Sequence, residues 1–280
     1  MKISNLIEYH PSKPIVMEKI RSGGKECRIM FCMRPVMDLN EIHMMYIGYM
    51  YYLLKKYENV HFDIILFDLI TTELDNRHIS DLEKSSLYEH RATENAKLIN
   101  RLLPLNHRKT FHLESKLPIM SSTYSLYDMF RGLTLSDLSR SRNAEDSLIE
   151  LFENVFEIIY LKRLKCDVVI GGPNEKPIWE WAQKIINKDI GLIILPQVPG
   201  LTNSAIKLND PGNESILTTD DIKNISAKLK NANPESIDFR KNVLIPLISK
   251  TIIDMDITND LTLGYQFLNE YIKKIKKERL

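Results

Sequence analysis

The sequence predicts an α/β protein, with a Rossmann-like parallel sheet flanked by helices and a short C-terminal helical region. Apolar runs of strand length alternate with long helical patterns, as in sheets whose parallel strands are joined by helices. Most of these runs are continuously apolar, which is typical of strands covered on both faces. A length of 280 residues, with 44% hydrophobic and 27% charged residues, is sufficient for a large globular core.

The alternation predicts buried strands at residues 27–33, 62–69, 109–113, 167–170 and 190–196. It predicts helices at residues 38–57, 91–103, 146–165, 176–187, 220–230, 239–255 and 263–277. Asp38 followed by Glu41 is a capping-box signature and predicts where the first helix begins. Turn composition at residues 231–238 predicts a boundary between a core of residues 1–232 and a helical appendage of residues 233–280.

Composition excludes several function classes. A net charge of +1 gives no general attraction to nucleic acid or membranes. The sequence shows no signal-peptide pattern and no run of the ~18 apolar residues that a membrane span requires, so we expect a cytoplasmic protein. Three cysteines without a CxxC pair argue against a disulfide framework or a zinc site, and we expect no metal centre.

Four segments follow one another in an informative order. They are residues 33–49, residues 62–74 (FDIILFDLITTEL), residues 166–185 (CDVVIGGPNEKPIWEWAQKI) and residues 199–221 (PGLTNSAIKLNDPGNESILTTDD). Together they resemble the catalytic core of class I aminoacyl-tRNA synthetases of the tyrosyl/tryptophanyl group, particularly the archaeal-type tyrosyl branch. The resemblance implies ATP with Mg²⁺ as cofactor. It also implies an amino acid, and a nucleotide or an aminoacyl-tRNA end, as ligands.

The motifs that handle ATP in that family are altered in this chain. At the family's HIGH motif, one alignment places His43-Met44-Met45-Tyr46 and another Tyr46-Ile47-Gly48-Tyr49. In the mobile loop the lysine signature has become AIKLN at residues 205–209. Candidate catalytic residues are His43, Lys207 and Arg34, and candidate nucleotide-binding residues are Gly171, Gly172, Tyr46 and Asn209. A packed helix histidine, a solvated loop lysine and a structural salt bridge remain ordinary alternatives for the first three.

The amino-acid pocket that the resemblance implies is also altered. Its candidate residues are Asp68, Glu153, Glu157, Tyr160 and Glu175. Residues 153, 157 and 160 are spaced by four and three, so they share one helix face. Two acids on that face predict a polar or cationic ligand, or a catalytic proton acceptor, rather than tyrosine. A solvated acidic stripe is the alternative.

Two functions from different classes remain open. The first is a repurposed enzyme that activates or transfers an aminoacyl group, and the second is an inactive paralogue that serves as a ligand sensor or interaction module. A transferase resembling cyclodipeptide synthases is a third option, although Cys32 and Met33 lie where that group has serine. tRNA is a candidate partner through the lysines of residues 273–277, and a homodimer through the tyrosine-rich stretch 42–57.

Overall fold

The fold was analysed in a computed structural model. It describes residues 8–9, 13–21, 24–75, 78–103, 106–117, 148–176, 178–179, 182–183, 190–202, 214–253 and 260–277. These residues form a six-stranded sheet in the order β1-β6-β5-β2-β3-β4. The strands are β1 (Glu8–Tyr9), β2 (Cys27–Met33), β3 (Val60–Leu66), β4 (Lys109–Leu113), β5 (Val168–Gly171) and β6 (Gly191–Ile194). The edge strand β1 runs antiparallel to β6, and the other neighbouring strands pair in parallel. The predicted fold class is confirmed.

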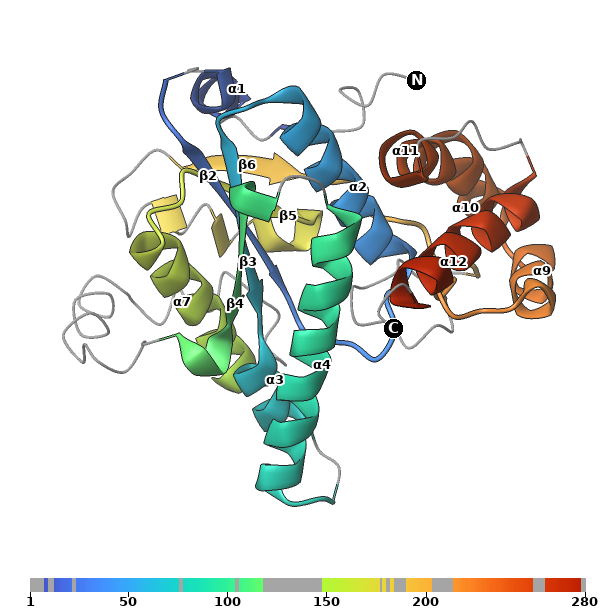
Figure 1. Ribbon diagram of the computed structural model, residues 1–280, viewed down its shortest axis with the longest axis horizontal. Helices are drawn as coiled ribbons and strands as arrows, with labels where there is room; N and C mark the ends of the chain where they lie inside the picture. Colours follow the sequence, from blue (N-terminus) through green and yellow to red (C-terminus); the bar gives the residue numbers. More distant parts are fainter. Residues whose placement is uncertain are drawn as a thin grey trace.

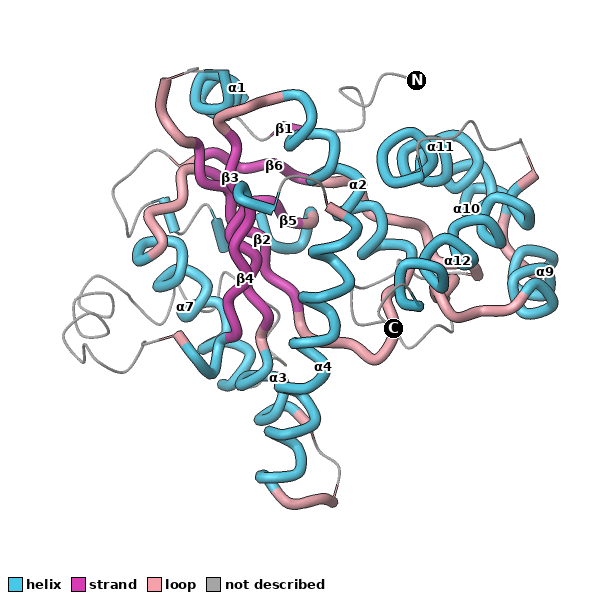
Figure 2. Tube along the Cα trace, in the orientation of Figure 1, coloured by secondary structure: helices cyan, strands magenta, loops and turns pink. Residues whose placement is uncertain are grey.

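Helices cover both faces of the sheet (Figure 1). The described helices before β5 are α1 (Lys13–Arg21), α2 (Glu41–Lys56), α3 (Asp68–Leu74), α4 (Asp81–Leu102) and α7 (Leu148–Arg163), with short 3-10 turns η2 (Asn106–Arg108) and η3 (Glu114–Lys116). One hydrophobic cluster joins α1, α2 and α4 to the sheet, and a second joins α7 and the segment around Trp179 to the opposite face. Figure 2 shows the strands enclosed between these two helical layers.

The first long helix begins later than the sequence predicts. Its N-cap is Asn40, whose side-chain oxygen accepts the N–H groups of residues 42 and 43, and α2 then runs from Glu41 to Lys56. Asp38 lies before the cap, and Glu41 turns inward instead of completing a capping box, because Arg240 pairs with its carboxylate. Twelve of the sixteen α2 residues are buried, so most of the tyrosine-rich stretch packs in the core, whereas Tyr51 and Tyr52 are half-buried. A homodimer through this stretch stays a prediction.

The second predicted strand is three residues too long at its end. β3 stops at Leu66, and α3 begins at Asp68, a short helix that the apolar run concealed. The helix predicted at residues 91–103 is the second half of α4, which begins after Ser80. Ser80 and Glu83 form a capping box there, so a sequence signal for the true start was present. The predictions for β2 and β4 are confirmed at both ends.

The chain after β6 forms a set of helices packed outside α2 (Figure 1). They are α9 (Ile222–Lys230), α10 (Pro234–Phe239), the π-helical η5 (Arg240–Leu244), α11 (Ile245–Ile248), the π-helical η6 (Ser249–Ile253) and α12 (Leu261–Lys277). The short 3-10 turn η4 (Pro173–Glu175) lies earlier, between β5 and β6. The expected boundary after residue 232 falls in the turn between α9 and α10. The helices beyond it share a hydrophobic cluster with α2. Gly48 permits this close packing, since a Cβ there would lie 3.0 Å from Thr251 Oγ1.

Helix α12 separates apolar and basic residues onto two faces. Tyr265, Leu268 and Ile272 are buried, whereas the lysines at positions 273, 274, 276 and 277 are exposed. None of the described helices has the length and apolar character needed to cross a membrane.

Candidate functional site

The order of the strands identifies where a ligand site is expected. The chain passes from β2 to β3 and β4 on one side, and from β5 to β6 on the other, so the connections diverge between β2 and β5. Open α/β sheets bind ligands outside the carboxyl ends of the strands at such a point. Half-buried Arg34 follows β2, and Gly171 and Gly172 end β5. The structure therefore brings three of the sequence candidates to the expected edge.

Glu175 covers the turn formed by Gly171 and Gly172. Its Oε2 accepts the Gly172 N–H at 3.2 Å and lies 2.1 Å from the point where a Cβ of residue 171 would be. The Tyr46 hydroxyl lies 3.3 Å from the corresponding point of Gly172. Burial, followed by the charge of Glu175, raises the pKa of Tyr46. The two glycines therefore lie in close contact with this chain's own side chains, and a carboxylate occupies the turn.

The N-terminus of α2 is closed by internal hydrogen bonds. The Asn40 N–H donates to His43 Nδ1 at 3.1 Å, and the Glu41 N–H donates to the Ile216 carbonyl at 3.2 Å. The N–H groups of residues 42 and 43 donate to Asn40 Oδ1 at 3.0 and 3.2 Å. These are the groups that a helix leaves unpaired and that bind phosphate in nucleotide sites. None of the four is available to a ligand in this conformation.

His43 lies in the first turn of α2 and is 1% exposed. Burial lowers its pKa to about 3, so the imidazole is neutral at physiological pH. Its Nε2 is buried without a hydrogen-bond partner among the described residues. A neutral ring can donate one hydrogen bond, but it cannot neutralise the charge of a phosphate.

The first turn of α2 and the Gly171–Gly172 turn do not fit the phosphate groups of ATP. The phosphate-binding end of α2 is capped from within the chain, His43 is uncharged, and Glu175 presents a negative charge beside Gly172. Phosphate groups are bound by free N–H donors and cations, which these positions do not supply. The candidates Lys207 and Asn209 lie outside the described residues.

A second group of side chains, here called the acidic cluster, follows β3 and β4. Asp68 accepts the Ser115 N–H at 3.0 Å and the Ser115 hydroxyl at 2.5 Å. Glu114 accepts the Ile70 N–H at 2.9 Å and the Tyr160 hydroxyl at 3.0 Å. Three elements that are distant in the sequence therefore converge at one end of the sheet.

Helix α7 completes the acidic cluster. Asp68 and Glu114 are each 3% exposed, and Glu157 on α7 is 8% exposed. Glu157 precedes Tyr160 by three positions, so both lie on the helix face predicted from the sequence. Burial, followed by the charge of Glu114, raises the pKa of Tyr160. Glu153 belongs to the same helix, but its side chain lies outside the described residues.

A buried ion pair joins α2 to the C-terminal helices. Arg240 Nε donates to Glu41 Oε2 at 3.0 Å, its Nη2 donates to Oε1, and the Tyr265 hydroxyl donates to the same carboxylate. Arg240 Nη1 also donates to the Pro199 carbonyl at 2.9 Å, and Glu41 Oε1 accepts the Ile216 N–H at 3.2 Å. The pair therefore contacts both ends of residues 199–221, here called the signature loop.

The two ends of the signature loop also bind each other. The Leu201 N–H donates to the Glu214 carbonyl at 3.0 Å, and the Thr202 N–H donates to Glu214 Oε2 at 2.8 Å. The Asn233 N–H, at the start of α10, donates to the Leu201 carbonyl at 2.8 Å. The loop is consequently held at its base, while residues 203–213 lie outside the described residues.

Sequence reasoning missed Glu114, Ser115 and the Glu41–Arg240 pair. Glu114 and Ser115 directly follow the correctly predicted strand β4, so the rule that ligands bind at carboxyl ends could have identified them. The pair joins residues 199 positions apart, and a single sequence carries no signal for such a contact.

Solved structures of aminoacyl-tRNA synthetases have the same fold. Tyrosyl-tRNA synthetase from Archaeoglobus fulgidus, complexed with L-tyrosine, gives a TM-score of 0.73 at 16% identity over 99% of both chains. The Aeropyrum pernix tyrosyl enzyme gives 0.70 at 12% identity, covering 95% of this chain and 94% of that chain. The chain has the class I synthetase core fold.

Similarity extends to the tryptophanyl enzymes. Tryptophanyl-tRNA synthetase from Giardia lamblia gives a TM-score of 0.69 at 14% identity, covering 97% of this chain and 84% of that chain. No protein-family model matches the sequence, and no curated protein matches it. The synthetase fold that the four motif segments imply is confirmed, at identities that establish the fold alone.

Proposed function

We propose that this chain is a repurposed synthetase-fold protein that binds an amino acid, or a similar amine-bearing molecule other than tyrosine, at the acidic cluster. The observation that carries the proposal is the burial of three carboxylates: Asp68 and Glu114 at the carboxyl end of the sheet, and Glu157 on the face of α7 that also carries Tyr160. Buried carboxylates are stabilised by a cationic partner, and a ligand ammonium group supplies one. A tyrosine substrate is not expected, because Glu114 already accepts a phenol hydroxyl from this chain's own Tyr160 at 3.0 Å.

We further propose that the activity is aminoacyl transfer without ATP. The lack of fit between ATP and the first turn of α2 supports a substrate that arrives already activated, such as the ester at an aminoacyl-tRNA end. An amine nitrogen would attack the ester carbonyl, forming an amide bond and breaking the ester C–O bond. The proton lost by the amine would pass to the departing ribose oxygen. A buried carboxylate such as that of Glu157 suits the role of proton acceptor.

An inactive binding module is the second candidate. It is favoured because the carboxylates at the carboxyl end of the sheet already accept hydrogen bonds from the chain itself. Asp68 binds Ser115, Glu114 binds Tyr160, and Glu175 binds Gly172. Such a site could bind a ligand without turning it over. The two candidates share the binding step and differ in catalysis.

Thermal-shift measurements with each of the twenty amino acids test the binding step. We expect at least one amino acid with a free amine to raise the Tm, and tyrosine to leave it unchanged. Glu157→Gln should weaken the response about tenfold in ligand concentration, because it removes one charge at nearly constant volume. The matched control is Glu270→Gln, which changes an exposed carboxylate on α12 and should respond as the wild type does.

Turnover separates the two candidates. An aminoacyl-tRNA mixture incubated with the protein and the amino acid identified above should yield amide product and free tRNA. A Tm response without product would support the binding module. Absence of any response to all twenty amino acids would contradict both candidates.

A further inference from the structure

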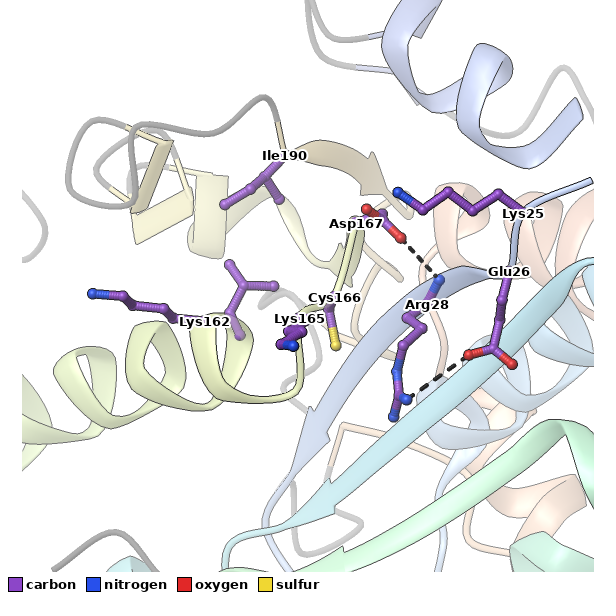
Figure 3. A pocket seen from close by; sticks show the side chains of 9 residues that line it. Lys25, Glu26, Arg28, Lys162, Lys165, Cys166, Asp167 and Ile190 are labelled. Atoms are coloured by element: carbon purple, nitrogen blue, oxygen red, sulfur yellow. Dashed lines mark hydrogen bonds and ion pairs between the residues drawn. The ribbon is translucent and has the colours of Figure 1, made fainter. Parts of the chain in front are cut away.

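A cavity of about 500 Å³ opens at the opposite end of the sheet, where the strands begin. Its lining comes from the start of β2 and the residues before it, from the residues just before β5 and β6, and from the end of α7 (Figure 3). The lining residues are Lys25, Glu26, Arg28, Leu161, Lys162, Lys165, Cys166, Asp167 and Ile190. This amino-end cavity is separate from the carboxyl edge and was not predicted from the sequence.

Cations outnumber acids around the amino-end cavity, and both acids already have partners. Asp167 accepts the Arg28 N–H at 3.3 Å and lies 3.8 Å from the Lys19 ammonium group. Glu26 lies 3.8 Å from Arg28 Nη1. By contrast, the ammonium groups of the lining lysines 25, 162 and 165 form no ion pair with any described residue. The cavity therefore carries positive charge that the described parts of the chain do not neutralise.

Arg28 is held in place by the buried carboxylate of Asp63. Its Nε and Nη2 donate to the two oxygens of Asp63 at 2.9 and 2.7 Å, and His112 Nε2 lies 2.9 Å from Asp63 Oδ1. Asp63 is fully buried, whereas the Arg28 side chain is 32% exposed. The remaining nitrogen, Nη1, lies 3.8 Å from the exposed carboxylate of Glu26, which is beyond hydrogen-bond distance. A guanidinium fixed on the wall of the cavity is a suitable anchor for a phosphate.

Lys165 has an unusual backbone conformation for its residue type. Its φ of 54° makes it the one described non-glycine residue with a positive φ, and it follows the last turn of α7. Glycine is the usual residue at that position because side chains disfavour the left-handed region. A lysine at this position places an ammonium group on the cavity wall at a conformational cost. Strained residues of this kind cluster at ligand sites.

We propose that the amino-end cavity binds a small phosphorylated molecule, with Arg28 as its anchor and Lys25, Lys162 and Lys165 around the phosphate. Leu161 and Ile190 provide an apolar wall for the rest of the ligand. In Figure 3, Lys25 and Lys165 lie on either side of Asp167 and Cys166, whereas Lys162 extends outward. The proposal is independent of the function assigned to the carboxyl edge.

Calorimetric titration with inorganic phosphate, pyrophosphate and phenyl phosphate tests this site. We expect pyrophosphate to bind more tightly than phosphate, through its extra charge, and phenyl phosphate also to exceed phosphate, through the apolar wall. Lys165→Gly should weaken all three at least tenfold while its Tm stays equal to or above that of the wild type, since glycine suits a φ of 54°. Loss of binding with an intact fold is the supporting result.

Two controls keep this result specific. Lys273→Gln, in the exposed basic face of α12, should bind all three probes as the wild type does. Equal affinity in wild type and Lys165→Gly, or no binding of any probe at millimolar concentration, would overturn the proposal. Binding of single-stranded RNA that Lys165→Gly abolishes, without binding of phenyl phosphate, would assign the lysines to a nucleic-acid surface and also overturn it.

Discussion

Two arginine–carboxylate pairs among the described residues have similar local geometry and different surroundings. In both, Nε and Nη2 of the arginine contact the two oxygens of one carboxylate. Arg240 and Glu41 are both fully enclosed, and Nη1 of Arg240 is bound by Pro199 and Ser236. Arg28 is 32% exposed and lines a cavity, and its Nη1 lies 3.8 Å from the exposed Glu26 carboxylate. The same ion pair thus closes the structure at one place and presents a charge at the other.

The two pairs also lie at opposite ends of the sheet. The Glu41–Arg240 pair lies at the start of α2, where it fixes both ends of the signature loop and closes the site in which the synthetase resemblance implies ATP. The Arg28–Asp63 pair lies where β2 begins and its cavity is basic. The acidic groups at the carboxyl end of the sheet therefore favour an amine ligand, and the basic groups at the amino end favour a phosphate ligand.

Breaking the fully buried Glu41–Arg240 pair should lower the free energy of unfolding the most. Arg240→Met leaves the Glu41 carboxylate buried without its cation, and we expect a loss of about 3–5 kcal/mol in the free energy of unfolding. Denaturation with urea measures it. The double variant Arg240→Met, Glu41→Gln should recover a large part of the loss because no charge remains buried. A single variant that loses less than about 1 kcal/mol would refute the structural role.

Breaking the partly exposed Arg28–Asp63 pair should lower the free energy of unfolding by a smaller amount and should also weaken pyrophosphate binding. Asp63→Asn removes the charge that fixes Arg28, but water can still reach the guanidinium, so we expect a loss of about 1–3 kcal/mol. Pyrophosphate affinity should fall about tenfold in calorimetric titration because the anchor is no longer oriented. Unchanged affinity would mean that Asp63 has only a structural role.

The pH dependence of the free energy of unfolding should distinguish His43, at the start of α2, from Asp63, which pairs with Arg28. Burial lowers the folded-state pKa of His43 to about 3, from about 6.5 when exposed. Below pH 6.5 the His43 imidazole is protonated in the unfolded chain but stays neutral in the folded chain. The free energy of unfolding therefore decreases as the pH falls from 6.5 toward 3. Between pH 6 and pH 5 we expect a loss of about 1 kcal/mol, measured by urea denaturation. His43→Gln should remove this part of the slope.

Asp63 titrates in a lower range. Burial alone would raise its pKa, but hydrogen bonds from His112 and Arg28 outweigh burial and lower it. Its contribution to stability is therefore present above the ordinary carboxyl pKa of about 3.9 and is lost only as pH falls further. In the Asp63→Asn variant, the slope between pH 6 and pH 5 should remain as in the wild type. If the slope between pH 6 and pH 5 disappeared in the Asp63→Asn variant, the pH dependence would arise from Asp63 and not from His43, which would contradict this assignment.

Local patterns predicted the sheet well and the site only in part. The runs at β2 and β4 carry continuous apolar sequence bounded by polar residues, and both strands were predicted at the correct ends. The second strand was wrong at its end, because Asp68 begins a helix that Ser115, 47 positions later, helps to fix. The start of α2 was wrong because Arg240 withdraws Glu41 from its expected capping role.

The candidate residues show the same limit. Gly171, Gly172 and Asp68 were found because a strand end is visible in sequence. The carboxylate that covers the glycines, Glu175, was a candidate for ligand contact, and its hydrogen bond to Gly172 emerges only from the folded turn. Contacts between distant segments decide which groups remain available to a ligand, and a single sequence does not encode them in any local pattern.

We propose that this synthetase fold handles an amine-bearing substrate without activating it with ATP. Amino-acid-dependent exchange of pyrophosphate into ATP, measured with all twenty amino acids between pH 6 and pH 9, tests it most directly. The closed N-terminus of α2 and the carboxylate beside Gly172 predict no exchange above background with any amino acid. Exchange that depends on tyrosine, or on any other single amino acid, would contradict the account.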